Sequence, residues 1–257
     1  MFVFTQMHQS ISVKCGLVSN VVFWVASLLG LYADHLVKSK KSPLLARCKL
    51  QPNQHLSPKE KLDLILLSFF NMIIVALFIC CPIFEWLWNH IQHHPDRLAE
   101  ADDWIWHREL LLKLPIHAIV AESGFYSIHV IMHRYPFLYR HIHKVHHRFI
   151  APTAMACVYA HPLEFAFGNI FPIYLGPMLT NAHPMTCYIF WFPLAMAGTC
   201  KGHCGYRIMG LVDPHDAHHF YFKLNYGGMY LADYLFGTTT KHPSEKKDEK
   251  LRMLGNG

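Results

Sequence analysis

Residues 64–84, LILLSFFNMIIVALFICCPIF, carry no charged side chain over 21 positions. A helix of about 20 apolar residues crosses a bilayer core of about 30 Å, so this stretch predicts a membrane span. Residues 15–33 are uncharged over 19 positions and predict a second span. Residues 110–132 predict a third, although Lys113 and Glu122 interrupt them. The expected fold is an all-α integral-membrane helical bundle with about four to five spans in hairpins.

The remaining spans are expected in residues 165–200, which are uncharged over 36 positions. The turn signal at 181–184, Asn-Ala-His-Pro, divides this stretch into two short spans that predict a hairpin. Pro172, Pro177 and Pro193 are expected to kink these helices, so a partly re-entrant hairpin stays open as an alternative.

Composition supports a membrane protein. Hydrophobic residues make up 53% of the 257 residues and charged residues 16%, whereas soluble domains carry about 25% charge. These values exclude a disordered chain and disfavour an ordinary soluble globule.

For residues 15–33, a cleavable signal peptide is the alternative to a retained anchor. We favour the anchor, because no charged region of the usual kind precedes it and no A-x-A site follows.

The charges between the spans predict the orientation. Segment 34–62 has seven Lys and Arg residues against two acids, and segment 134–150 has four against none. Segment 84–109 has two Lys and Arg residues against six acidic residues. The positive-inside rule places the first two segments and the tail at 201–257 in the cytosol, and segment 84–109 in the lumen. The lumenal segment contains histidines expected to be interfacial and tryptophans expected to form an aromatic belt: His90, His93, His94 and His107, and Trp86, Trp88, Trp104 and Trp106.

Cysteine usage and net charge exclude two further classes. The eight cysteines show no paired framework of the kind found in small secreted domains, so we expect reduced thiols. The net charge of +6 is mild and is not arranged like a nucleic-acid footprint, so no nucleic-acid partner is expected.

Histidine is unusually frequent in this chain, which has 21 histidines and only 17 acidic residues. Three clusters place eight of them at helical spacing: His129 and His133; His143, His146 and His147; His215, His218 and His219. Residues three and four apart share a helix face, so each cluster can present its rings together. One metal takes four to six ligands, so eight imply two metals or one crowded site. Surface histidines are the alternative, but two separate HxxHH clusters are not expected by chance.

The imidazole nitrogen of histidine limits which metal ions the site can bind. Imidazole suits Zn, Cu, Fe and Ni, and zinc normally takes four ligands, so a pair of irons fits eight histidines better. Four acidic residues are candidates to orient the ligand rings: Glu122, Glu164, Asp213 and Asp216.

Over residues 118–239 the sequence resembles the fatty acid hydroxylase/sterol desaturase superfamily. The resemblance rests on HVIMHRYPFLYRHIHKVHH at 129–147, AHPLE at 160–164, HCGY at 203–206, HDAHH at 215–219 and FGT at 236–238. The stretch at 143–164 looks most like the sterol C4-methyl oxidase branch. Sterol C5-desaturases and fatty acid hydroxylases are close relatives of that branch.

This resemblance implies a membrane diiron enzyme of the endoplasmic reticulum, with a cytosolic histidine-rich cap over its helices. It implies a lipid substrate, first a C4-methyl sterol, and electrons from NAD(P)H through cytochrome b5 and its reductase. Residues 1–109 would be a membrane anchor region, 110–240 the catalytic domain and 241–257 a solvated tail. Since no cytochrome b5 domain is recognisable, the donor is expected to be a separate protein. The implied metal residues are His129, His133, His143, His146, His147, His161, His203, His215, His218 and His219.

Some assignments stay open at this point. His161 and His203 are expected to be ligands or to contact ligands, whereas His141 lies off the shared face of its cluster. Cys200, His203 and Cys204 suggest zinc, but buried apolar thiols are the simpler interpretation. The alternative functions are a fatty-acyl or sphingolipid hydroxylase, a sterol C5-desaturase, a zinc-dependent membrane hydrolase and a scaffold without activity.

Overall fold

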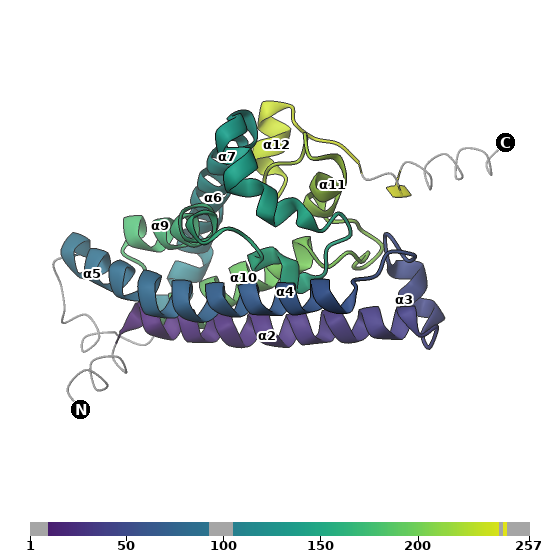
Figure 1. Cartoon of the computed structure of the whole chain (residues 1–257). Helices are drawn as coiled ribbons and strands as arrows, with labels where there is room; N and C mark the ends of the chain where they lie inside the picture. Colours follow the sequence, from purple (N-terminus) through teal and green to yellow (C-terminus); the bar gives the residue numbers. More distant parts are fainter. Residues whose placement is uncertain (1–9, 93–104, 242–243, 246–257) are drawn as a thin grey trace.

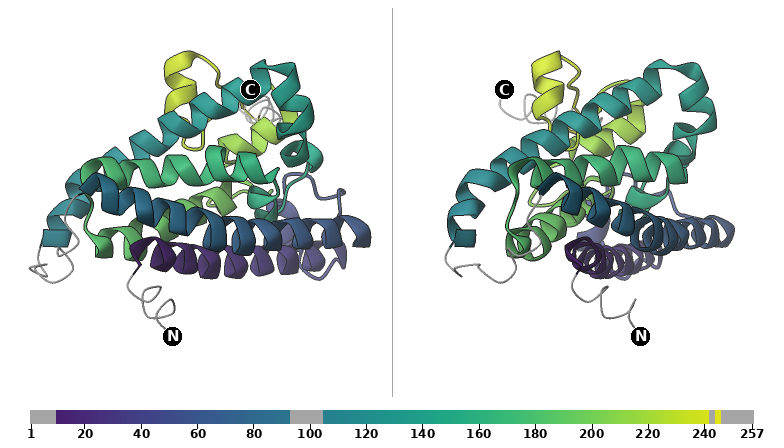
Figure 2. Two further views of the ribbon diagram at one scale, coloured as in Figure 1. Left: turned by 60° about the vertical axis from the view of Figure 1, so that its left-hand side comes forward. Right: turned by 90° about the vertical axis from the view of Figure 1, so that its left-hand side faces the viewer.

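The computed structural model describes residues 10–92, 105–241 and 244–245, and the regular elements in these residues are helices. Two long antiparallel runs form the lower layer in Figure 1: α2 (Ile11–Lys38), and α4 (Pro58–Phe69) continuing through the π-helix η1 (Phe70–Cys80) into α5 (Cys81–Gln92). The short α3 (Pro43–Cys48) lies between them in the chain. Helix α6 (Ile105–Arg134) crosses this layer obliquely and rises to α7 (Pro136–His141), as Figure 2 shows.

Three helices of the described chain are long and apolar enough to cross a membrane: Ile11–Lys38, Pro58–Ile91 and Leu110–Arg134. They contain the spans predicted at 15–33, 64–84 and 110–132. Helix α2 packs along α10, η4 and α5.

The stretch at 165–200 folds as the predicted pair of helical runs. The first run joins α8 (Pro162–Glu164), the π-helix η5 (Phe165–Ile170) and α9 (Phe171–Thr180). The second joins the π-helix η6 (Thr186–Trp191) to α10 (Phe192–Gly202). The predicted turn is confirmed, because Asn181 adopts a left-handed conformation (φ 48°) that ends α9. The indole of Trp191 donates to the Ile173 carbonyl at 2.8 Å and holds the two runs together.

Prolines in this stretch mark changes of helix type. Pro172 and Pro193 stand in the first turns of α9 and α10, each directly after a π-helical stretch. Each of these prolines lies inside a continuous helical run, so its missing N–H removes a backbone hydrogen bond there, and the change from π-helix to α-helix falls at that point. Pro177 lies inside α9. Helices α9 and α6 approach closely, since a Cβ on Gly176 would lie 2.7 Å from Cα of His117.

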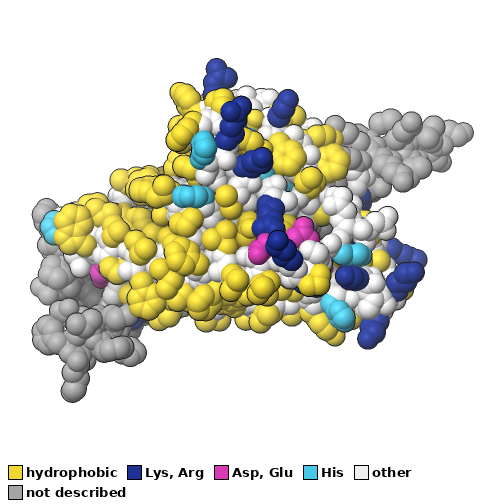
Figure 3. Space-filling view, viewed as in Figure 1, with side chains coloured by type: hydrophobic (Ala, Val, Ile, Leu, Met, Phe, Trp, Pro, Cys, Tyr) yellow, Lys and Arg dark blue, Asp and Glu magenta, His cyan; other side chains and the backbone are white. Residues whose placement is uncertain are grey.

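The outer faces of the long helices are apolar. Side chains more than half exposed include Val21, Leu28 and Leu29 on α2 and Phe78 on η1. Figure 3 shows hydrophobic side chains over most of one face, with Lys and Arg gathered near α3 and around α7. Such a surface is costly in water and favourable in hydrocarbon, so the bundle is built for a bilayer.

The inner face of α2 carries small and polar side chains instead. Ser12, Ser19, Asn20 and Ser27 are buried at helical spacing. A Cβ on Gly16 would lie 2.7 Å from Sγ of Cys81, so only glycine permits this approach of α2 to α5. Small residues let membrane helices pack closely where hydrophobicity gives no drive to associate.

The remaining elements cover the histidine-containing end of the bundle. They are the 3-10 helices η3 (His143–Arg148) and η4 (Ala154–Val158) and the α-helices α11 (Pro214–Tyr221) and α12 (Leu231–Phe236). The two basic segments meet here, since Arg148 donates to Asp63 at 2.7 Å and Gln51 to the Ile150 carbonyl at 2.9 Å. Segments 34–62 and 134–150 therefore lie at one end of the molecule, as the predicted orientation requires.

The predicted lumenal segment is described only in part. His93, His94 and Trp104 fall outside the described residues, as does most of the predicted tail at 241–257. Trp86 is 58% exposed, as expected of an interfacial residue, but Trp88 is buried at 4%. The prediction for Trp88 is therefore corrected, because this side chain belongs to the core. His90 is exposed and stacks on Trp86, far along the chain from the histidine clusters.

Candidate metal centre

Nine histidines gather in two groups at the covered end of the bundle. Within each group, one ring nitrogen from every residue lies within 4.8 Å of the others. The first group is His129, His133, His143, His147 and His218, and the second is His146, His203, His215 and His219. The structure therefore brings together nine of the ten residues expected to serve the metals.

The sequence clusters do not correspond to the two groups. Only one sequence cluster falls entirely within one group, namely His129 and His133, which lie one turn apart on α6. The 3-10 helix η3 contributes His143 and His147 to the first group and His146 to the second. Helix α11 also divides, with His218 in the first group and the other two histidines in the second. Each of these two helices serves both groups.

Backbone carbonyls fix the protons on several rings. Nδ1 of His129 lies 2.6 Å from the Tyr226 carbonyl oxygen, and Nδ1 of His218 lies 2.7 Å from that of Leu224. A carbonyl can only accept, so each Nδ1 carries the proton and each Nε2 presents a lone pair. His203 is held in the same way by the Thr199 carbonyl at 2.9 Å.

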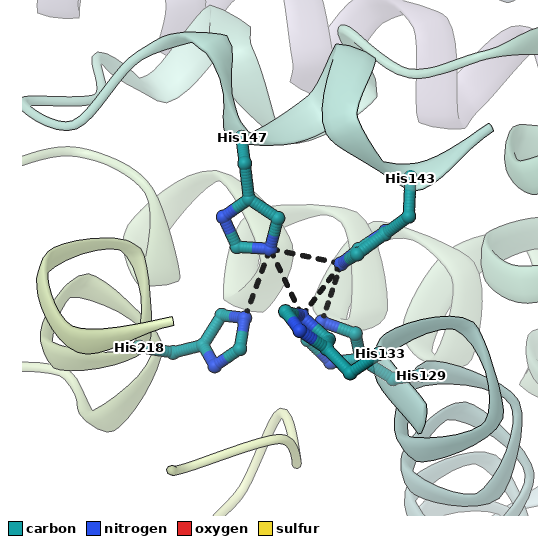
Figure 4. A group of neighbouring side chains, drawn as sticks. All are labelled: His129, His133, His143, His147 and His218. Atoms are coloured by element: carbon teal, nitrogen blue, oxygen red, sulfur yellow. Dashed lines mark hydrogen bonds between the residues drawn. The ribbon is translucent and has the colours of Figure 1, made fainter. Parts of the chain in front are cut away.

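The lone pairs of the first group converge (Figure 4). Nε2 of His143 lies 3.0 Å from that of His129 and 2.8 Å from those of His133 and His147. A single ring nitrogen carries at most one proton, so it cannot hydrogen-bond to three other nitrogens. A shared cation removes the repulsion. The group offers five nitrogen donors, one more than a zinc ion usually takes.

The second group has the composition of a second metal site. Nε2 of His203 lies 3.2 Å from Nε2 of His146. His219 is fully buried and neither of its ring nitrogens has a hydrogen-bond partner. Unpaired buried donors and acceptors are rare in folded proteins, and a bound ion would satisfy this ring.

Burial keeps these rings neutral and ready to bind a metal. Desolvation lowers the pKa of His146 to about 4. It also brings the pKa values of His203, His215 and His218 well below their ordinary range, and neighbouring histidines lower them further. Neutral imidazole is the form that binds metals.

One predicted carboxylate orients a ring. Oε1 of Glu164 lies 2.7 Å from Nδ1 of His143, and both side chains are buried. The other three candidates touch backbone instead. Glu122 accepts from the N–H groups of Gly228 and Met229, Asp213 accepts from the N–H of His215 at the start of α11, and Asp216 accepts from that of Gly205. These three carboxylates hold loops and helix ends, not ligand rings.

A cavity of about 400 Å³ reaches both groups. Its walls include His129 and His143 of the first group and His146, His203 and His215 of the second, and mainly apolar side chains of the membrane helices. Its volume falls within the range of small-molecule sites, about 300–1,000 Å³. A lipid in this cavity would meet the histidines from the membrane side.

Three predicted residues lie apart from the groups. Nδ1 of His161 accepts from the N–H of Leu163 and caps α8, so His161 joins neither group. The zinc alternative fails, because Cys200 lies 3.7 Å from Cys157 and Cys204 points to the Tyr206 carbonyl. All eight cysteines lie in the described residues, and none of them forms a disulfide bond there.

The sequence did not reveal the residues that hold the loop at 224–233. Asp233 accepts from the N–H groups of Tyr226 and Gly227 and from the hydroxyl of Thr238. This loop presents the carbonyls that orient His129 and His218. The FGT motif at 236–238 marked the region without indicating this role.

Comparisons with known proteins agree with the site. The sequence model described as fatty acid hydroxylase matches residues 114–238. Fatty acid hydroxylase ahd1 of Mycosarcoma maydis is 34% identical over 216 residues, covering 82% of this chain and 54% of that protein. Fatty acid hydroxylase domain-containing protein 2 of Homo sapiens is 31% identical over 237 residues, covering 90% and 68%. Methylsterol monooxygenase 2-2 of Arabidopsis thaliana is 33% identical over 145 residues, covering 51% and 53%.

The chain spans about half the length of the first and third of these relatives. No solved structure matches it. The human relative is matched over more than two thirds of its length at 31% identity, and the family model covers all nine grouped histidines. This chain belongs to the fatty acid hydroxylase family.

Proposed function

We propose that this protein is a membrane-embedded lipid monooxygenase in which two iron ions are held by the nine grouped histidines. The observation that carries the proposal is the convergence of histidine ring nitrogens in two groups beside one apolar cavity. The first group offers five nitrogen donors, more than the four that a zinc ion usually takes, so a zinc hydrolase fits less well.

The protein's own groups would do three things. The histidines would hold two ions, which supply the oxidation of an unactivated C–H bond by O₂. The Glu164 carboxylate and the carbonyls of Tyr226 and Leu224 would keep the ligand rings oriented. The apolar cavity would position a lipid carbon beside the ions and exclude water, which limits side reactions.

A sterol is the first substrate proposed, with oxidation of a C4-methyl group as the reaction. Support comes from the stretch at 143–164 and from the similarity to a methylsterol monooxygenase. Fatty-acyl hydroxylation is the second candidate. The similarity to ahd1, which is named a fatty acid hydroxylase, extends over 82% of this chain and favours it.

We further propose that the catalytic end faces the cytosol from the endoplasmic reticulum membrane. The basic segments at 34–62 and 134–150 meet at that end, which the positive-inside rule assigns to the cytosol. Electrons would then come from NAD(P)H through cytochrome b5 and its reductase on the same side.

The test is a comparison of membrane lipids by mass spectrometry. A host that lacks sterol C4-methyl oxidation would express the wild type or a His146→Ala/His218→Ala variant, which removes one member of each histidine group. His161→Ala is the matched control, because this histidine joins neither group.

Loss of 4-methyl sterols with the wild type and the control, but not with the double variant, would support the sterol assignment. Hydroxylated acyl chains that form with the wild type and the control, but not with the double variant, would support fatty-acyl hydroxylation. Equal oxidation by the double variant would refute the metal centre as the source of activity.

A further inference from the structure

The cavity opens on one side. Most residues of its described wall are buried, and the exposed ones come from two places, α10 and the loop at 224–233. On α10, Leu194 is 62% exposed, and Gly198, one turn further along, is exposed as well. In the loop, Met229 is 51% exposed, and Gly228 beside it is exposed. The opening therefore lies between α10 and this loop.

Helix α6 forms the other edge of this gap. Ala118 and Ala121 on α6 line the cavity and are partly exposed. Helix α6 packs mainly along α9 and α10 mainly along α2, so the two helices border the cavity from different sides. A Cβ on Gly198 would meet no atom within 4 Å. Small residues on both edges, alanine on α6 and glycine on α10, thus leave a gap between the helices, the α6/α10 opening.

Two contacts mark the ends of the α6/α10 opening. At one end the ring of Trp191 meets that of His117 on α6, with centroids 5.4 Å apart. At the other end the Glu122 carboxylate accepts from the N–H groups of Gly228 and Met229 at 2.8 and 2.9 Å. His117 and Glu122 are five residues apart on α6, which corresponds to about 7.5 Å along the helix. The opening is therefore bounded at both ends.

The surface around the opening is that of a membrane span. Ile119 on α6 is 51% exposed and Ile189 on η6 is 44% exposed. Residues 114–121 and 165–200 contain no charged side chain. Such an apolar edge is costly in water and favourable in hydrocarbon. The α6/α10 opening therefore faces the lipid of the bilayer.

Both edges of the opening lead to the histidine groups. On α6, Phe125 and His129 follow Ala121 at spacings of four residues, so the three side chains share one helix face. All three line the cavity, and His129 belongs to the first group. On α10, Thr199 lines the cavity and is followed four residues later by His203 of the second group. A lipid that enters between the two helices would therefore reach both groups.

We infer that the α6/α10 opening is the entrance through which the substrate passes sideways from the bilayer to the histidines. The inference rests on the proposed function, because it assigns a route into the same cavity. Gly198 controls entry because its missing side chain leaves the opening free. Met229 controls it because a flexible thioether chain lies at the rim. The substrate class is therefore a lipid dissolved in the bilayer.

An entrance residue and a binding contact differ in their kinetics. A residue at an entrance changes a barrier, so the association and dissociation rate constants change by the same factor and Kd stays constant. A residue that touches the bound lipid changes Kd instead. Gly198→Leu, which narrows the opening, should lower both rate constants by about tenfold. Met229→Ala, which widens it, should raise both.

The measurement uses purified protein in detergent micelles, without O₂ or electron donor. The protein is mixed by stopped flow with cis-parinaric acid or dehydroergosterol in the same micelles. Both probes accept excitation energy from tryptophan, and Trp191 lines the cavity. Only the saturable part of the energy transfer is counted, which excess unlabelled palmitic acid or cholesterol removes.

Ala197→Leu is the matched control. Ala197 is exposed on α10 next to Gly198, but it does not line the cavity. This variant should leave both rate constants and Kd unchanged. If Gly198→Leu does not fold, Met229→Ala tests the same entrance from the loop with the opposite sign.

Parallel changes of both rate constants at constant Kd would support the entrance, and the probe that shows them would assign an acyl lipid or a sterol. Four results would overturn it: no saturable transfer in the wild type, unchanged rate constants in both entrance variants, a change in Kd carried by one rate constant alone, or an equal slowing in Ala197→Leu. Because no turnover is needed, a protein without oxygenase activity that shows the parallel changes would refute the proposed function and leave the entrance standing.

Discussion

The contact between Glu164 and His143 offers a sharp test of how the first histidine group is held. Glu164→Gln keeps the size of the side chain and leaves an oxygen that can accept from Nδ1 of His143, now 2.7 Å from the carboxylate. It removes the negative charge. Solvent does not screen this loss, because the two side chains are only 4% and 0% exposed.

The magnitude follows from the type of hydrogen bond. A bond to a charged group contributes about 1.5–3 kcal/mol and a neutral one about 1 kcal/mol. A difference of about 1–2 kcal/mol weakens iron binding by about 5- to 30-fold. This agrees with the loss of about 10- to 100-fold usual for groups that orient metal ligands.

The assay is competition for iron between the purified protein and a chelator of known affinity. Glu85→Gln is the matched control. Glu85 is a half-buried carboxylate that accepts from the N–H of Ser12 at 2.9 Å, and neither α5 nor α2 contributes a grouped histidine. It should change thermal stability more than iron affinity. Wild-type iron affinity in Glu164→Gln would refute the role given to this contact.

Further variants separate ligands from neighbours. His203→Ala should lower bound iron from two ions towards one or none per protein, whereas His161→Ala should leave two, as measured by elemental analysis; equal iron in both would contradict the second group. Burial lowers the pKa of His146 to about 4, below the ordinary value of about 6.5, so its stabilising effect is present above pH 6.5 and is lost as the pH falls towards 4. The melting temperature of metal-free protein should therefore fall over that interval, and a flat profile would oppose it. A side chain at Gly198, which lines the cavity, would meet no atom within 4 Å at Cβ. Gly198→Leu should thus keep the wild-type melting temperature and iron content while reducing turnover of the bulkiest substrates; equal turnover of all substrates would show that the substrate does not pass this wall.

The sequence predicted those features that depend on local patterns. Uncharged stretches located the three long helices, because hydropathy over about 20 residues is sufficient for a bilayer. Helical spacing selected the histidines, and the resemblance added His203, which lies in no cluster. His161 shared a motif with Glu164, and only the fold showed that the carboxylate of that motif, not its imidazole, reaches the metal ligands.

Other features depend on tertiary contacts that no local pattern contains. The carbonyl of Tyr226 orients His129 from 97 positions along the chain and that of Leu224 orients His218 from six, and any residue could supply either carbonyl. The division of η3 and α11 between two groups depends on which rings of the other elements each histidine meets, whereas the spacing alone suggested one shared face per helix.

The division of η3 has a consequence for how the protein acquires its metals. His146 and His147 are adjacent in the chain but belong to different groups, and α11 divides in the same way. A backbone shift that opens one group must therefore also move ligands of the other. Binding of the first ion should preorganise the second group, so the two ions are expected to enter as a cooperative pair, with little half-loaded protein at equilibrium. A membrane oxygenase built in this way would hold either both ions or none. Protein with a single ion would be rare, which limits the release of partly reduced oxygen species into the bilayer.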